Sequence, residues 1–314
     1  MIDIQEIFSQ LNQEESFRRI KDIDGPISVY CGIREANLPS IAFLTNNPPV
    51  VIESTQCIRV SQWEERDKTF WSRFDLQKSN ARAIFYALCI DLIQSTEGAK
   101  DTTEAIYNVK NRYSIWRKMF KRPSTVMSVE EYQGLFGELY YLYYSLAPKV
   151  GIEGAIKAWS GAKRTAKDFS YDEDWFEVKT VTTGVSEIKI SSLNQLEADN
   201  VGRLIVVRVE RMAENYSDGH SSVDELINTI MNEVKDIAVK DDFMEKVTAY
   251  GYSADLDMSL FPRYCVKTIK TYLVDKSFPR ITTKDIAHDE IIRVTYTLSI
   301  NAIKKYMEAS NGNN

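Results

Sequence analysis

Between residues 128 and 212 the apolar pattern changes its period several times over a short length, which restricts the folds that this chain can adopt. Residues 129–147 carry leucines at helical spacing, and Ser128 with Glu131 forms a capping-box pattern that starts the helix. Alternating and continuous apolar runs then predict a short helix at 191–199 and strands at 166–170, 174–181, 185–190 and 202–210. The order of helix, three antiparallel strands, helix and strand indicates a mixed α/β (α+β) core.

The segments on either side of this core have a different pattern. Short alternating runs separated by Pro and Asn clusters predict an antiparallel sheet over 26–60, and helical spacing follows at about 80–97 and 103–121. After Ala213 a polar loop precedes two helices and two alternating strands. We therefore predict an N-terminal β-rich and helical region, a central core and a C-terminal α+β region, at 1–125, 126–212 and 213–314.

Composition argues against several classes of protein. The chain has four cysteines without a C-x-x-C pair and two histidines, which is poor material for a Cys/His zinc site or a Ser-His-Asp hydrolase. It has no signal-peptide pattern and no apolar stretch long enough to span a membrane, so we expect a cytoplasmic protein with no membrane association. The net charge of −6 argues against nonspecific coating of nucleic acid, but not against a local basic patch.

One constellation of charged residues points to a chemical role: Asp168, and then Glu177, Val178 and Lys179. Side chains two apart on a strand share a face, so Glu177 and Lys179 point together while Val178 packs on the opposite side. A turn at 171–174 lets the strand with Asp168 pair with the E-x-K strand. Carboxylates can bind Mg²⁺ and lower the pKa of a coordinated water, and a lysine can orient that water or stabilise a charged transition state.

Further residues extend this candidate site. Glu138, on the preceding helix, can add a carboxylate to the site or to a second metal, and Val178 can offer its carbonyl oxygen to the metal. Gln195, in the following helix, can hold a phosphate or a water. From spacing alone, an exposed hairpin held by salt bridges is the better explanation of these charges. The order of the predicted elements favours the catalytic interpretation.

Several short motifs bear a resemblance to a known family. They are Q-G-L-F-G-E-L at Gln133–Leu139, W-S-G at Trp159–Gly161, D-F at Asp168–Phe169, E-V-K-T at Glu177–Thr180 and I-S-S-L-N-Q-L at Ile190–Leu196. Together they resemble the bacterial PD-(D/E)XK motif protein family. The resemblance extends to W-R-K near the N-terminal region and to S-F-P-R-I near the C-terminal end, so it covers most of the chain.

The resemblance implies a restriction-endonuclease-like fold and a set of site residues. Asp168, Glu177, Lys179 and Glu138 take the catalytic positions, and Gln195 is a helper. One departure is Lys167, which stands where the superfamily name has proline. Members of the family are thought to accompany restriction–modification or phage-defence genes. We therefore expect an Mg²⁺-dependent DNA endonuclease, with Mn²⁺ as an alternative ion.

Candidate nucleic-acid contacts come from two basic clusters. Lys110, Arg117 and Lys121 lie on one face of the helix at 103–121, and Lys163 and Arg164 precede Asp168. Either cluster can contact phosphates. The alternatives are a solvated helix face for the first and an exposed loop for the second.

Two other functions remain open at this point. One is a DNA-binding subunit that keeps the fold but is non-catalytic or needs partners for activity, which the acidic net charge favours. The other is an enzyme that acts on RNA or on a nucleotide with the same core. Because cutting both strands usually needs two active sites, a homodimer or further subunits of a defence system are the expected partners.

Overall fold

The computed structural model describes residues 3–11, 17–20, 25–121, 127–161, 167–216, 219–288 and 290–308. The chain forms two compact units. The first unit comprises Met1–Val126, Ile227–Glu233 and Gly251–Met258, and the second unit comprises Met127–Leu226, Val234–Tyr250 and Ser259–Asn314. In the described part of the chain, no helix has the length and apolar character needed to cross a membrane.

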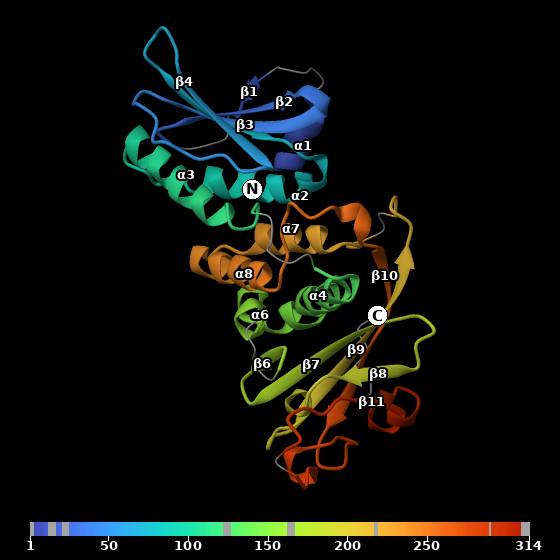
Figure 1. Ribbon diagram of the computed structural model, residues 1–314. Coiled ribbons are helices and arrows are strands. Elements are labelled where there is room, and N and C mark those ends of the chain that lie inside the picture. Colours follow the sequence, from blue (N-terminus) through green and yellow to red (C-terminus); the bar gives the residue numbers. More distant parts are fainter. Residues whose placement is uncertain are drawn as a thin grey trace. The chain divides into compact units, whose positions relative to one another are not determined.

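The first unit is an antiparallel sheet covered by helices. Its strands are β1 (Phe17–Arg19), β2 (Ser28–Arg34), β3 (Leu38–Thr45), β4 (Ile58–Glu64) and β5 (Phe70–Leu76), in the order β1-β2-β3-β5-β4. Two long helices lie together on one side of the sheet in Figure 1, and a short one precedes the sheet: α2 (Arg82–Gln94), α3 (Thr102–Trp116) and α1 (Ile4–Ser9). The rings of Phe74 on β5 and Tyr113 on α3 meet edge to face at 4.9 Å, which joins the two layers.

The helices predicted at 80–97 and 103–121 are confirmed as α2 and α3, but α3 ends at Trp116. Asp91 binds two side chains of the C-terminal part of α3 in the core. The Asp91 carboxylate pairs with the Arg112 guanidinium and accepts a hydrogen bond of 2.6 Å from Trp116 Nε1, and all three side chains are buried. Arg112 is therefore a core residue, although its charge suggests the basic helix face.

The second unit contains a four-stranded sheet of mixed direction. The strands are β6 (Phe169–Tyr171), β7 (Asp174–Thr182), β9 (Gly202–Met212) and β10 (Arg263–Val274), in the order β10-β9-β7-β6. β7 and β9 run parallel, whereas the outer pairs are antiparallel. The helices of the second unit are α4 (Val129–Tyr141), the π-helical turn η3 (Leu142–Leu146), α5 (Ala147–Val150), α6 (Ile152–Ala158) and α8 (Ile237–Ala249). The helix α7 (Val223–Glu233) is divided, with Ile227–Glu233 in the first unit.

The third strand of the predicted core is not part of this sheet, which corrects the expected order of three paired strands. That segment is β8 (Glu187–Ile190), and it pairs with β11 (Tyr296–Ser299) in a separate two-stranded sheet. Both edges of β7 are already occupied, by β6 and β9, so no edge is left for β8. An apolar cluster packs the small sheet against the large one through Ile188, Leu298, Leu204 and Val206.

The helix predicted at 191–199 is also wrong. Only the 3₁₀ turn η4 (Leu193–Gln195) forms there. Lys167 Nζ donates to the backbone carbonyls of Asn194, Gln195 and Glu197 at 2.7, 2.9 and 3.1 Å. Because these carbonyls turn toward one lysine, they do not continue a helical ladder.

The helix α4 lies directly against β7. An added Cβ at Gly137 would lie 1.8 Å from Thr180 Oγ1 and 2.9 Å from Thr180 Cβ. The capping box of Ser128 and Glu131 starts this helix as predicted. The absence of a side chain at Gly137 therefore brings the next residue, Glu138, close to the strand that carries the E-x-K motif.

Gly137→Ala is expected to lower the free energy of unfolding by about 1–3 kcal/mol, the usual cost of overpacking a filled core. Helix propensity alone would favour alanine by about 1 kcal/mol, so a loss reports the contact with Thr180. Urea denaturation measures the change. Gly154→Ala in α6 is the matched control, since its nearest neighbour is Val150 Cγ2 at 3.3 Å. Equal effects of the two substitutions would contradict the close contact of α4 with β7.

Candidate active site

The hairpin of β6 and β7 brings Asp168 alongside the E-x-K strand. The register pairs Phe169 with Phe176, so Asp168, one residue earlier, lies across from Glu177. Asp172 closes the turn with a φ of 52°, a left-handed conformation that aspartate tolerates. The Val178 N–H donates to Asp168 Oδ2 at 2.7 Å. The Asp168 carboxylate is therefore fixed to the main chain between Glu177 and Lys179.

Alternation along β7 gives Glu177 and Lys179 a common face, and Lys179 Nζ lies 2.9 Å from Glu177 Oε1. The Glu177 side chain is 2% exposed, whereas that of Lys179 is 17% exposed. Val178 is buried on the opposite face. The lysine therefore lies at the boundary between the buried carboxylate and solvent, where a substrate can reach its amine.

The carboxylates of this cluster are electrostatically unfavourable when ionised. Burial, and next the charge of Asp168, raise the pKa of Glu177 to about 8, although Lys179 opposes the shift. Burial also raises the pKa of Asp168, against the opposing charge of Lys179 and the hydrogen bond from Val178. The charges of Lys179 and Lys167 oppose these shifts but do not offset the burial of the two carboxylates. Further positive charge would therefore stabilise the ionised forms of both acids.

Glu138 lies within the electrostatic reach of both acids and is itself buried, with 6% exposure. Burial, and next the charge of Asp168, hold its pKa well above the usual range. Both of its oxygens accept hydrogen bonds of 2.8 Å, Oε2 from Trp159 Nε1 and Oε1 from the Tyr250 hydroxyl. These two donors fix the orientation of the third acidic side chain of the cluster.

Gln195 is connected to the cluster through the residue before Asp168. Lys167 Nζ donates to the Gln195 carbonyl oxygen and lies 3.7 Å from the centre of the Trp175 ring. Burial lowers the pKa of Lys167 to about 8. The Gln195 side chain accepts a hydrogen bond of 2.8 Å from the Ser191 N–H through Oε1, which leaves its amide nitrogen as a donor. Lys167, at the proline position of the motif name, thus anchors the η4 turn beside Asp168.

A groove of about 330 Å³ adjoins Lys179. Its lining includes the basic residues Lys189 and Arg211 and the acidic residues Glu130 and Glu187. Lys179 is the residue that the groove shares with the acidic cluster. The groove therefore gives solvent access to Lys179.

The predicted nucleic-acid contacts are not part of this cluster. Lys110, Arg117 and Lys121 belong to the first unit, and Arg117 Nη2 pairs with Glu53 Oε2 at 2.5 Å. Lys110 and Arg117 line a cavity of about 300 Å³. Lys163 and Arg164 lie outside the described residues.

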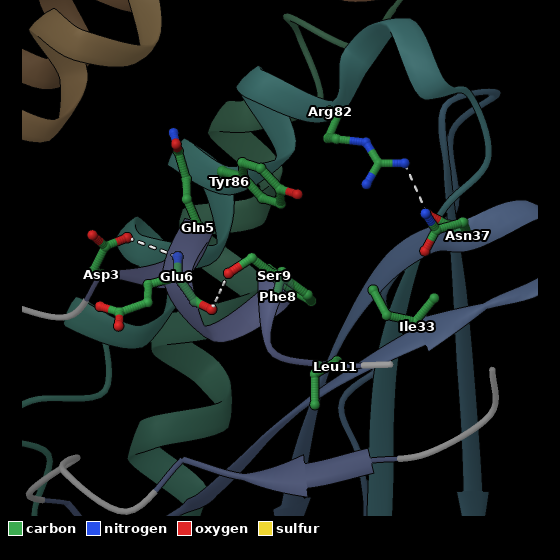
Figure 2. A pocket seen from close by; sticks show the side chains of 10 residues that line it. All are labelled: Asp3, Gln5, Glu6, Phe8, Ser9, Leu11, Ile33, Asn37, Arg82 and Tyr86. Carbon is green, nitrogen blue, oxygen red and sulfur yellow. Dashed lines mark hydrogen bonds between the residues drawn. The ribbon is translucent and has the colours of Figure 1, made fainter. Parts of the chain in front are cut away.

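A larger cavity, of about 970 Å³, lies in the first unit between α1, α2 and the end of β2. Figure 2 shows Arg82 reaching across to Asn37, whose carbonyl oxygen accepts from Arg82 Nη2 at 2.8 Å. Phe8 and Tyr86 stack on one side of it, with ring centres 5.3 Å apart. None of the candidate catalytic residues lines this cavity, so its size does not make it the active site.

Sequence reasoning missed three residues that hold the acidic cluster in position. The sequence indicates Trp159 only as part of the W-S-G motif and Lys167 only as a departure from the proline of the superfamily name, and it gives no signal for Tyr250. Each acts through a hydrogen bond to a residue distant in sequence. No local periodicity signals such a bond, because the partner is decided by tertiary packing.

In the described residues, no three Asp, Glu, His or Cys side chains converge closely enough to hold a metal ion by themselves. A cation at this cluster would have to rely on two carboxylates together with backbone, water or substrate oxygens. That donor set fits Mg²⁺, which keeps several waters and is often bound by one or two carboxylates.

Comparison with known proteins supports the resemblance seen in the sequence. No curated protein and no solved structure matches the chain. The model of the family described as "Putative PD-(D/E)XK family member, (DUF4420)" matches residues 4–301. This match confirms the predicted resemblance to the PD-(D/E)XK family and the predicted mixed α/β fold class. The chain belongs to this PD-(D/E)XK family.

Proposed function

We propose that this protein is a metal-dependent nuclease that hydrolyses phosphodiester bonds in DNA at Asp168, Glu177 and Lys179. The PD-(D/E)XK superfamily consists generally of nucleases, which supports a nuclease-like activity. The observation that carries the proposal is the paired geometry of the hairpin. Asp168 is bonded to Val178 N–H, and Lys179 Nζ lies 2.9 Å from Glu177 Oε1.

Asp168 and Glu177 are the proposed ligands of a divalent cation, with the Val178 carbonyl as a backbone ligand. Glu138 is the proposed carboxylate of a second metal or of a water bound to the first, since no three acidic side chains in the described residues converge on one ion. The raised pKa values of the two acids support this assignment, because a bound cation would stabilise their ionised forms. Mg²⁺ is the proposed ion and Mn²⁺ an alternative, since both prefer oxygen ligands. When bound, the ion supplies the Lewis acidity that activates water and offsets charge on the phosphate.

The remaining residues have roles that follow from their charge and position. Lys179, partly exposed beside Glu177, orients the attacking water and stabilises negative charge that develops on the phosphate. The Gln195 amide nitrogen can donate to a phosphate or water, because its carbonyl oxygen is held by Ser191. Trp159 and Tyr250 are positioning residues, since they act on Glu138 and not on the substrate.

The biological setting that we propose is a restriction–modification or phage-defence system. A homodimer or a second subunit would supply the active site that cuts the second DNA strand. This setting rests on the sequence resemblance alone. A partner-dependent DNA-binding subunit is the second candidate function. The net charge of −6 favours it, because an acidic chain gains little from nonspecific attraction to DNA.

Cleavage of plasmid DNA tests the proposal. Unmodified and methylated plasmids are incubated with the full chain and Mg²⁺ or Mn²⁺, and parallel samples contain EDTA. Nicking or linearisation that needs the metal supports a nuclease. A folded protein that binds DNA but cuts neither plasmid with either ion would favour the partner-dependent subunit. RNA in place of DNA tests whether the substrate is the other nucleic acid.

Lys179→Ala is expected to lower the rate of this cleavage at least about 100-fold, which is the usual contribution of a well-placed catalytic side chain. Lys149→Ala, an exposed lysine on α5, is the matched control and should cut at the wild-type rate. Thermal unfolding of both variants checks that they fold. Full cleavage by folded Lys179→Ala would remove Lys179 from the catalytic role.

The pH dependence of stability in EDTA is expected to report the acidic cluster. The folded-state pKa of Glu177, about 8, lies above the unfolded value of 4.5, so the folded chain holds this proton more tightly. That stabilisation is complete below pH 4.5 and is lost as the pH rises through about 8. Urea midpoints between about pH 5 and pH 9 should therefore fall more steeply in the wild type than in Glu177→Gln. Parallel curves would show that Glu177 does not titrate in this range.

A further inference from the structure

The sheet of the first unit has a second face that is not apolar. Alternation puts Cys31, Ile41 and Phe74 on the buried face, which packs on α2 and α3. Figure 1 shows both helices on that one side of the sheet. The register pairs Tyr30 with Ala42 and Trp71 with Trp63, which places these residues on the opposite side.

This opposite side, hereafter the aromatic face, carries a row of rings across neighbouring strands. Trp63 on β4 and Trp71 on β5 stack with ring centres 5.9 Å apart and planes 12° apart. Tyr30 on β2 follows, with its ring centre 4.8 Å from that of Trp71. The Arg73 guanidinium lies 5.2 Å from the centre of the Trp63 ring. Tyr30, Trp63, Trp71 and Arg73 are all partly exposed to solvent.

The aromatic face carries two exposed arginines, although the chain as a whole is acidic and the Glu65 carboxylate accepts a hydrogen bond of 2.8 Å from Trp63 Nε1. Arg19, paired with Tyr30, and Arg59, on the same face of β4 as Trp63, are exposed. Neither takes part in an ion pair with any residue that the structure describes. Asp75, an acid on this face, is buried and accepts hydrogen bonds from Ser40 Oγ at 2.6 Å and from Arg73 Nε at 3.0 Å. Its charge is therefore compensated, whereas those of Arg19 and Arg59 are available to a ligand.

We propose that the aromatic face binds single-stranded DNA, with bases stacked on Trp63, Trp71 and Tyr30 and phosphates contacted by Arg19 and Arg59. Partly exposed aromatic rings on a sheet can accept the flat face of any base, and arginines beside them attract the backbone. A duplex cannot bind in this way, because its bases are stacked on each other. The match to a nuclease-like family makes a nucleic acid the fitting occupant. This proposal does not depend on hydrolysis at Asp168 and Glu177.

The test is binding of a fluorescein-labelled oligothymidylate of about 15 nucleotides, a length in the range that sheet-based single-strand sites cover. Anisotropy is measured with the full chain in EDTA, so that cleavage plays no part. Duplex DNA and an oligouridylate of the same length are competitors. We expect the single-stranded DNA to bind most tightly and the duplex to displace it poorly, because the bases of a duplex are stacked on each other.

Trp63→Ala should weaken this binding at least about fivefold, the effect of losing one stacked base, while Trp63→Phe should largely restore it. Tyr107→Ala, a 49% exposed tyrosine on α3, is the matched control and should bind as the wild type does. Arg59→Gln should reduce the slope of log K against log salt by about 0.7, the contribution of one phosphate contact to a single strand. Thermal unfolding confirms that each variant is folded.

The proposal is overturned if the oligothymidylate does not bind, or if folded Trp63→Ala binds it as tightly as the wild type. Equal losses in Trp63→Ala and Tyr107→Ala would also overturn it. Tighter binding of duplex DNA or of RNA would reject single-stranded DNA as the ligand. Loss of plasmid cleavage with intact oligothymidylate binding would remove the proposed nuclease activity and leave this site standing.

Discussion

The close contact of α4 with β7 is the constraint on which the acidic cluster depends. Gly137 permits it, because any side chain there would occupy the space of Thr180. The contact brings Glu138 to the strand that carries Glu177 and Lys179, while the β6–β7 hairpin brings Asp168 from the other side. A helix and a hairpin thus gather acids from three positions in the sequence at one place in the second unit.

This gathering is energetically unfavourable without further positive charge. Burial raises the pKa values of all three acids, and the charge of Asp168 raises those of Glu138 and Glu177 further, although Lys179 Nζ lies 2.9 Å from Glu177 Oε1. The neighbouring hydrogen bonds from Val178, Trp159 and Tyr250 fix the carboxylates in orientation. Buried ionisable side chains with shifted pKa values, fixed in orientation by hydrogen bonds, are common at functional sites, where they lower the stability of the fold but serve the reaction.

The sequence predicted the parts of the site that depend on local periodicity. The alternation of β7 put Glu177 and Lys179 on one face, and the Y-D-E-D turn allowed Asp168 to approach them. It failed where competition between segments decides the outcome. β8 could not join the sheet because β6 and β9 already occupy the edges of β7. The predicted helix at 191–199 does not form, and Lys167 binds backbone carbonyls of that segment instead. The aromatic face could not be predicted from the sequence either, because Tyr30, Trp63 and Trp71 become neighbours only through the order of the strands in the sheet.

The central claim is that Asp168 and Glu177 form a cation site in a nuclease. Thermal unfolding with increasing Mg²⁺, against NaCl of equal ionic strength, tests it without any need for a substrate. The account predicts a saturable rise in the stability of the wild type, by about 2.7 kcal/mol once Mg²⁺ exceeds its Kd about 100-fold, and little or no rise in Asp168→Asn. No specific stabilisation of the wild type, or an equal one in Asp168→Asn, would contradict the account.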